Sequence, residues 1–207
     1  YICNGFTLNN DLMRLSDIEN HLKKFRVGIA GAGGLGSNCA AALARTGIGT
    51  LVIADFDKVE PSNLSRQYYF VNQIGMMKAE ALKDNLLRIR PEINIVIHQV
   101  KLNKENIPSL FAGCHVIVEA FDRSDMKEML IETVQNELPG VPLIVGSGMA
   151  GWGKNDILKF RQIDETLYVC GDELTEASDD LPPLAPRVGI VASMQANTVV
   201  EILMKIL

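Results

Sequence analysis

The sequence has 207 residues, 47% of them hydrophobic and 22% charged, which is typical of a folded globular protein with a sizeable core and excludes a disordered chain. A formal net charge of −5, without a stripe of lysine or arginine, argues against a nucleic-acid-binding surface. No apolar stretch approaches the roughly 20 residues that span a bilayer, and no signal peptide is visible. We therefore expect a cytoplasmic protein that binds neither nucleic acid nor a membrane.

Residues 1–25 are predicted to form an appendage to one domain over residues 26–207. Residues 1–6 fit a short strand and turn, and residues 12–25 have helical spacing of apolar side chains. The chain starts with Tyr1 rather than Met, so we expect a fragment whose native N-terminus is missing.

The pattern around which the chain is organised begins with an apolar strand at 27–30 and the glycine-rich GAGGLG at 31–36. An alanine-rich helix follows to Thr46, and a second strand at 50–54 ends on Asp55. Glycines let a backbone approach phosphate oxygens, and a helix N-terminus offers unpaired N–H groups to them. The residues predicted to cradle the phosphates are Gly31, Gly33, Gly34, Leu35 and Gly36. Asp55 has the spacing of a carboxylate that binds ribose hydroxyls, so we predict a nucleotide site.

The next segment, residues 56–72, is a long polar and aromatic connection where a doubly wound fold has only a few residues. Long connections in compact domains are functional or disordered, and the aromatic residues argue for function. An amphipathic helix is predicted over 75–90, before Pro91. Lys78 falls in its first turn, where a cation opposes the helix dipole, which indicates an anion nearby.

Strands alternating with helices predict a Rossmann-like doubly wound α/β fold with a mostly parallel sheet and antiparallel strands near the C-terminal part. The ligand is expected at the C-terminal ends of the strands. The remaining predicted strands are 93–99, 115–119, 141–146 and the pair 157–163 and 167–170; the remaining helices are 104–111, 124–137 and 188–207. Residues 171–186 hold five acids, three prolines and no base, and are predicted to form a mobile loop.

This topology brings a set of polar side chains to the glycine loop. They are Asp55, Asp57, Asn63, Arg66, Gln67, Lys78 and Asp122. Cations and aspartates beside a phosphate-binding helix suit phosphoryl or nucleotidyl transfer from a nucleoside triphosphate, with Mg²⁺ held by a carboxylate. Taken singly, Arg66 or Lys78 also fits an ordinary surface cation, and Asp122 a helix cap. A nicotinamide-dependent oxidoreductase and a non-catalytic scaffold remain alternatives at this point.

The four cysteines, at positions 3, 39, 114 and 170, form no C-x-x-C pair, so neither a zinc ribbon nor a redox dithiol is predicted. Cys39 and Cys114 lie in apolar surroundings and are predicted to pack in the core.

Five segments together resemble successive blocks of the ThiF/MoeB/HesA family, the bacterial relatives of ubiquitin-activating enzymes. They are GAGGLGSN, ADFDKVEPSNLSRQ, QIGMMKAEALKDNLLRIRP, VEAFD and APRVGIVASMQANTVVEIL. The resemblance covers residues 24–207. Within the family, the chain looks most like the small ThiF subtype that adenylates ThiS in thiamine biosynthesis. It implies an adenylyltransferase that uses ATP and Mg²⁺ on the C-terminal glycine carboxylate of a ubiquitin-like sulfur carrier, within a homodimer. Activation of a molybdopterin-synthase carrier, or of a tRNA-base carboxylate, is the alternative within the family.

The resemblance also implies roles for single residues. It makes the glycine loop the phosphate cradle and Asp55 the ribose carboxylate, and it places Asp122 as the catalytic aspartate that works with Mg²⁺. The positions that contact or neutralise the triphosphate are Asn63, Arg66, Gln67 and Lys78, of which Arg66 and Lys78 are catalytic.

The sequence departs from the family pattern in four places. The paired C-x-x-C motifs are absent, so no structural zinc is expected, and Arg123 follows Asp122 where asparagine is usual. No R-x-x-R-Q segment is present, and Arg14 is the nearest candidate for an arginine that acts across the dimer. Cys170 is close to the loop in which some members carry a sulfur-handling cysteine, but YVCGD does not match its setting. The acidic loop at 171–186 is interpreted as a clamp that carrier binding orders.

Overall fold

A computed structural model describes residues 13–206, so the strand and turn predicted over 1–6 lie outside the described residues. One seven-stranded sheet crosses the molecule in the order β3-β2-β1-β4-β5-β7-β6. The strands are β1 (Arg26–Ala30), β2 (Thr50–Ala54), β3 (Asn94–His98), β4 (Val116–Glu119), β5 (Leu143–Gly146), β6 (Lys159–Gln162) and β7 (Leu167–Gly171). All neighbours pair in parallel except β6 and β7. The predicted Rossmann-like sheet with antiparallel strands near its C-terminal part is therefore confirmed.

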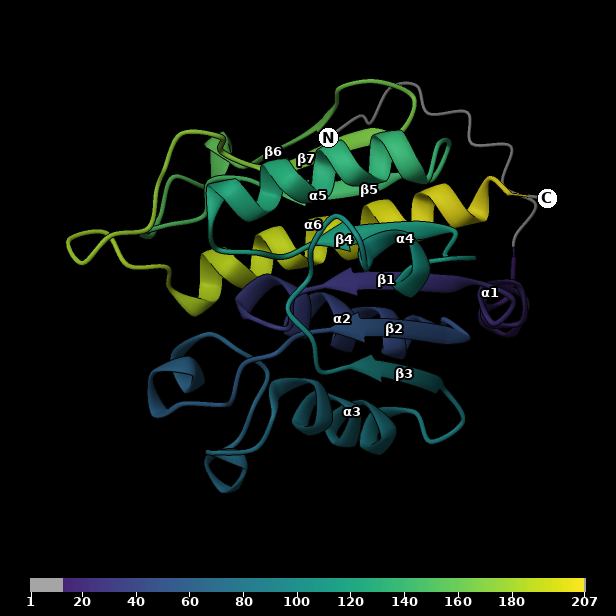
Figure 1. Ribbon diagram of the computed structural model, residues 1–207, viewed down its shortest axis with the longest axis horizontal. Helices are drawn as coiled ribbons and strands as arrows, with labels where there is room; N and C mark the ends of the chain where they lie inside the picture. The colour runs from purple at the N-terminus through teal and green to yellow at the C-terminus, as the bar shows by residue number, and fades with distance from the viewer. Residues whose placement is uncertain (1–12, 207) are drawn as a thin grey trace, which may run out of the picture.

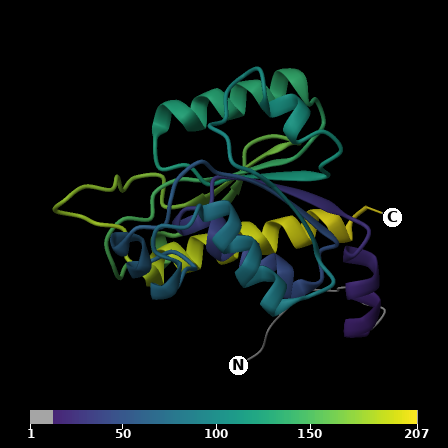
Figure 2. The same ribbon diagram turned by 60° about the horizontal axis from the view of Figure 1, so that its bottom comes forward.

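Helices cover both faces of this sheet (Figures 1 and 2). The helices are α1 (Leu15–Leu22), α2 (Gly34–Thr46), α3 (Lys78–Ile89), α4 (Ile107–Leu110), α5 (Ser124–Glu137) and α6 (Ala185–Met204). Helices α2, α3 and α6 share one apolar core cluster, while α4 and α5 cover the other face with a second cluster. Among helices in the described residues, none is long and apolar enough to cross a membrane.

Close packing of α2 explains its small residues. Its alanines let α2 lie directly along α6, and Gly47, with φ of +95°, ends the helix in the left-handed conformation that glycine favours. Cys39 of α2 is fully buried in this cluster, and Cys114 is 5% exposed in the second cluster. The predicted core positions of both cysteines are confirmed.

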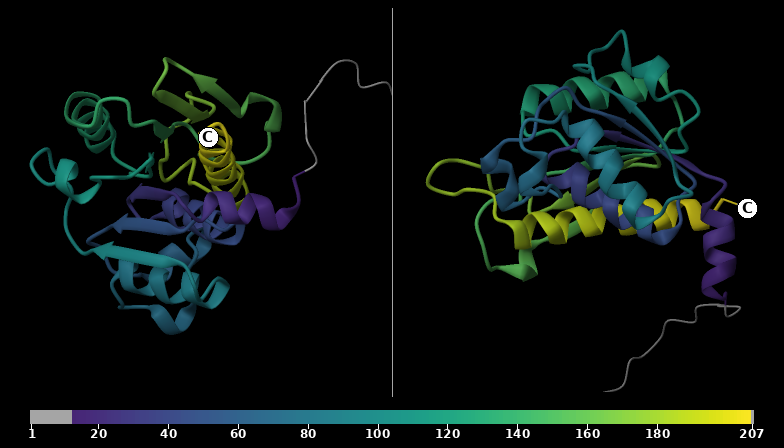
Figure 3. Two further views of the ribbon diagram at one scale, coloured as in Figure 1. Left: turned by 90° about the vertical axis from the view of Figure 1, so that its right-hand side faces the viewer. Right: turned by 90° about the horizontal axis from the view of Figure 1, so that it is seen from below.

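The predicted helix over 12–25 is the shorter α1, which packs against the sheet at the N-terminal ends of the strands. Leu22 is fully buried, and the imidazole Nε2 of His21 lies 3.0 Å from the carbonyl oxygen of Leu203. Figures 1 and 3 show α1 at the end of the molecule opposite the loops that follow β1, β2 and β4. Arg14, at the start of α1, therefore lies far from the glycine loop of its own chain.

The C-terminal ends of three adjacent strands meet at the other end of the sheet. Ala30 of β1 pairs with Ala54 of β2 on one side and with Glu119 of β4 on the other. The glycine loop, Asp55 and the segment leading to Asp122 consequently start side by side. In a parallel sheet this edge, where the strand order reverses, is where ligands bind.

Candidate functional site

The glycine loop makes a turn that only glycine fits at two positions. Gly31 has φ of +100°, and a Cβ there would lie 2.9 Å from the carbonyl oxygen of Ala120. A Cβ on Gly36 would lie 1.9 Å from the carbonyl oxygen of Gly31. The first N–H groups of α2, which begins at Gly34, have no partner within the helix and carry the positive end of its dipole. This edge of the loop is therefore suited to binding an anion.

Asp55 ties β2 to this loop. Its carboxylate accepts the backbone N–H of Ala32 at 2.7 Å and that of Asp57 at 2.8 Å, and the residue is 9% exposed. Burial raises the pKa of Asp55, while these two N–H groups and the Lys78 ammonium oppose the shift. Each carboxylate oxygen has a second lone pair, so a ribose hydroxyl can still donate to Asp55.

Lys78 and Asp57 form an ion pair beside Asp55. The Lys78 Nζ lies 2.9 Å from Asp57 Oδ2, and the backbone N–H of Lys78 donates to the Asp57 carbonyl oxygen at 2.8 Å. Lys78 is the first residue of α3 and is 7% exposed, whereas the Asp57 side chain is 49% exposed. The structure thus places a nearly buried cation at a helix start, with one half-exposed carboxylate to balance it.

Arg66 and Gln67 lie over the first turn of α2. The Arg66 Cγ is 3.7 Å from the position a Cβ would take on Gly34, and Gln67 Nε2 is 3.9 Å from that on Gly33. Asn38 fixes this contact, because its Nδ2 donates to the carbonyl oxygens of Gly34 and Arg66 at 2.7 and 2.9 Å. Within residues 13–206, the buried Oε1 of Gln67 has no hydrogen-bond donor, so it can accept one from a ligand.

Asn63 shapes the loop that carries Arg66. Its Oδ1 accepts the N–H of Glu60 at 3.0 Å, and its carbonyl oxygen accepts the N–H groups of Arg66 and Gln67 at 3.1 and 2.9 Å. Asn63 is 8% exposed. In this structure Asn63 positions the two predicted phosphate-contacting residues, and its own contact with a triphosphate stays a prediction.

Asp122 is exposed at the end of β4, two residues beyond the Ala120 that packs on Gly31. The following Arg123 pairs instead with Asp125, with Arg123 Nη2 2.6 Å from Asp125 Oδ2. Within residues 13–206 no cluster of three or more His, Cys, Asp or Glu side chains could enclose a metal. A Mg²⁺ that arrives with a nucleotide needs only one or two carboxylates besides phosphate and water oxygens, and a solvent-facing Asp122 fits that donor set.

Cys170 does not have the surroundings of a reactive thiol. It is fully buried in β7, and burial raises its pKa to about 11, with the Thr198 hydroxyl opposing the shift. The nucleophilic form of cysteine is the thiolate, so this environment disfavours a sulfur-handling role.

A model of the ThiF family matches residues 9–206 of the chain. The chain belongs to the ThiF family. The resemblance noted in the sequence is thus confirmed at the family level, whereas the ThiS-specific subtype stays a prediction.

Curated relatives of this ThiF chain include two proteins named adenylyltransferases. The molybdopterin-synthase adenylyltransferase of Salmonella typhimurium is 31% identical over 199 residues, which cover 93% of this chain and 79% of that protein. The adenylyltransferase and sulfurtransferase UBA4 of Saccharomyces cerevisiae is 31% identical over 192 residues, covering 89% of this chain and 43% of UBA4. The chain therefore spans less than half the length of the yeast protein.

Solved structures share the fold. The tRNA N6-threonylcarbamoyladenosine dehydratase of E. coli in complex with AMP superimposes with a TM-score of 0.81 at 19% identity, covering 90% of this chain and 89% of that one. The same dehydratase in complex with ATP gives 0.81 at 18% identity. E. coli MccB gives 0.71 at 22% identity and covers 91% of this chain and 58% of MccB.

Several residues that complete the site of this ThiF chain were missed in the sequence. The Tyr69 hydroxyl donates to the carbonyl oxygen of Ala32 at 2.7 Å, and burial, with Asp55 and Asp57 adding to the effect, raises the pKa of Tyr69 so that it remains a donor. Ser37 Oγ donates to the carbonyl oxygen of Gly33 and accepts the N–H of Tyr68. The aromatic residues of the 56–72 connection were the available signal, but only the fold shows which of them reaches the loop.

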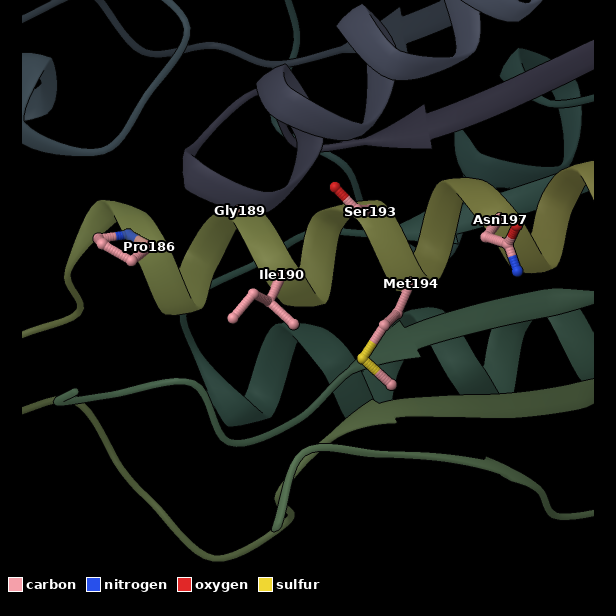
Figure 4. Close-up of a pocket in the computed structure, with 6 residues that line it drawn as sticks. All are labelled: Pro186, Gly189, Ile190, Ser193, Met194 and Asn197. Carbon is pink, nitrogen blue, oxygen red and sulfur yellow. The ribbon is translucent and has the colours of Figure 1, made fainter. Parts of the chain in front are cut away.

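A second feature of the ThiF chain is a half-exposed stripe along α6, which lines a hollow of about 610 Å³ (Figure 4). Its residues recur every three or four positions: Pro186, Gly189, Ile190, Ser193, Met194 and Asn197. Ile190 and Met194 point to the same side of the helix, and Ile190 is 39% exposed. The small side chains at 189 and 193 would let another surface approach the helix backbone closely.

Proposed function

We propose that this chain uses ATP to adenylate the C-terminal glycine carboxylate of a ubiquitin-like sulfur carrier, a ThiS-like protein of thiamine biosynthesis. The observation that carries the proposal is the placement of two cations, Lys78 and Arg66, beside a glycine loop that is tied to Asp55. The Salmonella and yeast relatives are both named adenylyltransferases, which supports adenylyl transfer rather than hydride transfer.

The reaction requires the protein to stabilise a leaving group. A carboxylate oxygen of the carrier attacks the α-phosphorus of ATP, a new P–O bond forms, and the bond to the pyrophosphate oxygen breaks. Negative charge grows on the pyrophosphate, where Arg66 and Lys78 act as catalytic cations. No general base is needed, because a C-terminal carboxylate is already ionised at pH 7.

Nucleotide binding is assigned to the groups that surround the cations. The N–H groups of the 31–36 loop take phosphate oxygens, Asp55 takes the ribose, and Asp57 holds Lys78 in place. In this proposal Asn63 and Gln67 contact the triphosphate or support the residues that do. Asp122 would hold Mg²⁺, which supplies charge neutralisation at the phosphates when it is bound.

The carrier tail is proposed to reach Asp122 beneath the acidic 171–186 loop. A hollow of about 480 Å³ between α5 and the ends of β5 and β7 supports this path, since Ser124, Lys127 and Ser147 line it. The loop is anchored at several points: the N–H of Gly151 donates to the carbonyl oxygen of Pro182 at 3.0 Å, the N–H of Ala150 donates to Thr175 Oγ1 at 3.2 Å, and Asp172 pairs with Arg187. We propose that carrier binding orders the rest of it as a clamp; protease sensitivity that carrier plus ATP leaves unchanged would argue against this.

We further propose a homodimer, formed over the stripe on α6. Small and apolar side chains on one face of a 20-residue helix suit close packing against a second copy. Arg14, which lies away from its own site, would then be the candidate to act across the dimer. Ile190→Glu should give a monomer in sedimentation, while Val71→Glu, at a 73% exposed apolar residue elsewhere, should not.

The test of the proposed function is ATP–pyrophosphate exchange with Mg²⁺, with and without carriers ending in Gly-Gly. Exchange that needs the intact tail supports carboxylate adenylation, and comparison of ThiS-like with molybdopterin-synthase carriers identifies the partner. Arg66→Ala should abolish exchange, while Lys205→Ala, which breaks an exposed pair with Glu201, should not. Absence of exchange with every carrier, together with NADH binding seen by fluorescence, would overturn the proposal in favour of an oxidoreductase.

A further inference from the structure

A carboxylate side chain is completely buried at the end of β4, three residues before Asp122. Glu119 is 0% exposed, and its Oε1 accepts the backbone N–H of Phe121 at 2.5 Å. Its Oε2 accepts the backbone N–H of Gly146, the last residue of β5, at 3.3 Å. The carbonyl oxygen of Glu119 accepts Gln195 Nε2 at 2.9 Å. One side chain thus fixes the direction in which the chain leaves β4.

Lys127 of α5 completes this arrangement. Its Nζ lies 3.0 and 2.8 Å from the two carboxylate oxygens of Glu119 and donates to the carbonyl oxygen of Gly146 at 2.8 Å. The pair consequently joins three elements, namely the end of β4, the start of α5 and the end of β5. Because α5 begins at Ser124, the segment between the two paired residues is the one that carries Asp122.

Both segments that the pair joins pack against the glycine loop. A Cβ on Gly31 would lie 2.9 Å from the carbonyl oxygen of Ala120, and one on Gly36 would lie 3.1 Å from the Ala120 Cβ. A Cβ on Gly146 would lie 2.3 Å from Cδ1 of Leu35, which belongs to the loop itself. The two segments that the pair joins are therefore packed directly against residues of the phosphate-binding edge.

Stability alone does not account for such a pair. Removing two charges from water costs free energy that their attraction often fails to recover, and apolar residues of similar size commonly replace buried ion pairs without loss. What apolar residues cannot replace is the set of directed bonds to the Phe121 N–H and to both backbone groups of Gly146.

We propose that Glu119 and Lys127 are positioning residues for adenylyl transfer, which hold the Phe121–Asp122 segment at its working distance from the glycine loop. The inference rests on the proposed function, but it adds a requirement that lies outside the nucleotide-contacting residues. The pair acts through the backbone of Phe121 and through Gly146, and not by contact with the nucleotide.

The experiment uses Glu119→Gln, Lys127→Met, the double variant that neutralises both, and Lys104→Met as a matched control. Lys104 forms an exposed pair with Glu132 on the same helix, with side chains 61% and 51% exposed. The kinetics of ATP–pyrophosphate exchange give kcat and the KM for ATP, and denaturant unfolding gives the stability. Hydrogen exchange of the peptide containing Phe121 measures how well that segment is protected with and without ATP.

Each single variant should lose about 10- to 100-fold in kcat, the scale of a 1 Å misplacement, while the KM for ATP changes by no more than about threefold. The double variant should regain the unfolding midpoint that the single variants lose, but not kcat. In the unmodified protein and in Lys104→Met, ATP should slow hydrogen exchange around Phe121. In the two single variants and the double variant, ATP should leave that exchange rate unchanged.

If the double variant recovers both kcat and stability, the proposal is overturned, and the pair formed by Glu119 and Lys127 has only a structural role. If the unmodified protein catalyses no ATP–pyrophosphate exchange with any carrier, the proposed function is wrong instead. The positioning role is then decided by ATP-dependent protection around Phe121, which needs no carrier, and unchanged protection in the variants would overturn it.

Discussion

The carboxylate of Asp55 accepts the backbone N–H of Ala32 across 2.7 Å, so the end of β2 holds the glycine loop that follows β1. Tyr69 binds the same residue from the other side, since its hydroxyl donates to the Ala32 carbonyl oxygen at 2.7 Å. Both backbone polar groups of one loop residue, Ala32, are thereby fixed by side chains from elsewhere in the chain. The shape of the loop depends on these side chains as well as on its glycines.

Replacement of Asp55 by asparagine should loosen the loop. The asparagine side chain keeps one acceptor oxygen, so either the N–H of Ala32 or that of Asp57 is left unpaired, at a cost of about 1–3 kcal/mol. Denaturant unfolding should show this loss, and the affinity for ATP should fall with it. Tyr69→Phe provides the comparison, with a smaller loss of about 1 kcal/mol. An unfolding free energy equal to that of the unmodified protein would show that the Asp55 bonds carry no stability.

Two glycines of the loop should respond differently to alanine. In Gly36→Ala the new Cβ would meet the Gly31 carbonyl oxygen at 1.9 Å, and backbone must move, so we expect a large loss of stability and of ATP binding. In Gly33→Ala the nearest atom lies 3.9 Å away, so the fold should be retained. If phosphates approach the backbone at Gly33, that variant should still bind ATP more weakly. Equal unfolding midpoints for the two variants would contradict this reading of the loop.

Lys78→Met should separate catalysis from stability. Its partner Asp57 is half exposed and regains water when the ammonium is removed, while the buried Asp55 loses an opposing charge, so the unfolding free energy should fall by less than the roughly 3–5 kcal/mol typical of breaking a fully buried pair. Loss of one charge-stabilising group at the leaving phosphates should lower the exchange rate by about 10²- to 10³-fold. ATP–pyrophosphate exchange assays measure this rate, and Asp57→Asn serves as the control for loss of the ion pair itself. A rate close to that of the unmodified protein would remove Lys78 from the catalytic set.

Local sequence patterns predicted most of the fold. The helix expected over 124–137 is α5 (Ser124–Glu137), and the strands expected to pair near the C-terminus are β6 and β7. Boundaries moved where turns compete with helices. The helix predicted from residue 75 begins at Lys78, because Gly75 takes φ of +90° and Met77 bridges to Lys58. The last helix begins at Ala185, since a proline is well tolerated in a first helical turn.

The candidate site was predictable only where its signal is local. The glycine spacing and Asp55 follow from one strand–helix–strand unit, and Lys78 from its unfavourable place in a helix. The pair formed by Glu119 and Lys127 follows from no periodic pattern, because it depends on how β4, β5 and α5 come together. Asn63 has a structural role that its type and position do not reveal, because its side chain accepts the N–H of Glu60 within the loop; its contact with the triphosphate stays a prediction.

The buried pair formed by Arg187 and Asp172 should make the protein sensitive to acid. Arg187 Nη2 lies 2.5 Å from Asp172 Oδ2, and the two side chains are 3% and 0% exposed. Burial raises the pKa of Asp172, but the N–H groups of Thr175 and Leu174, the Thr175 hydroxyl and the Arg187 guanidinium outweigh it, so the pKa is lowered overall.

Because the folded-state pKa of Asp172 lies below the unfolded value of 3.8, its stabilisation is complete above that value and is lost as the pH falls through the folded-state pKa. Asp172→Asn should therefore be destabilised at pH 7, by about 3–5 kcal/mol because the Arg187 charge is left buried, and the difference from the unmodified protein should shrink below pH 4. Unfolding free energies between pH 7 and pH 3 measure this. Asp179→Asn, from the same loop, should keep the full acid dependence, because Asp179 is exposed. A constant difference between Asp172→Asn and the unmodified protein across this range would show that Asp172 does not titrate with folding.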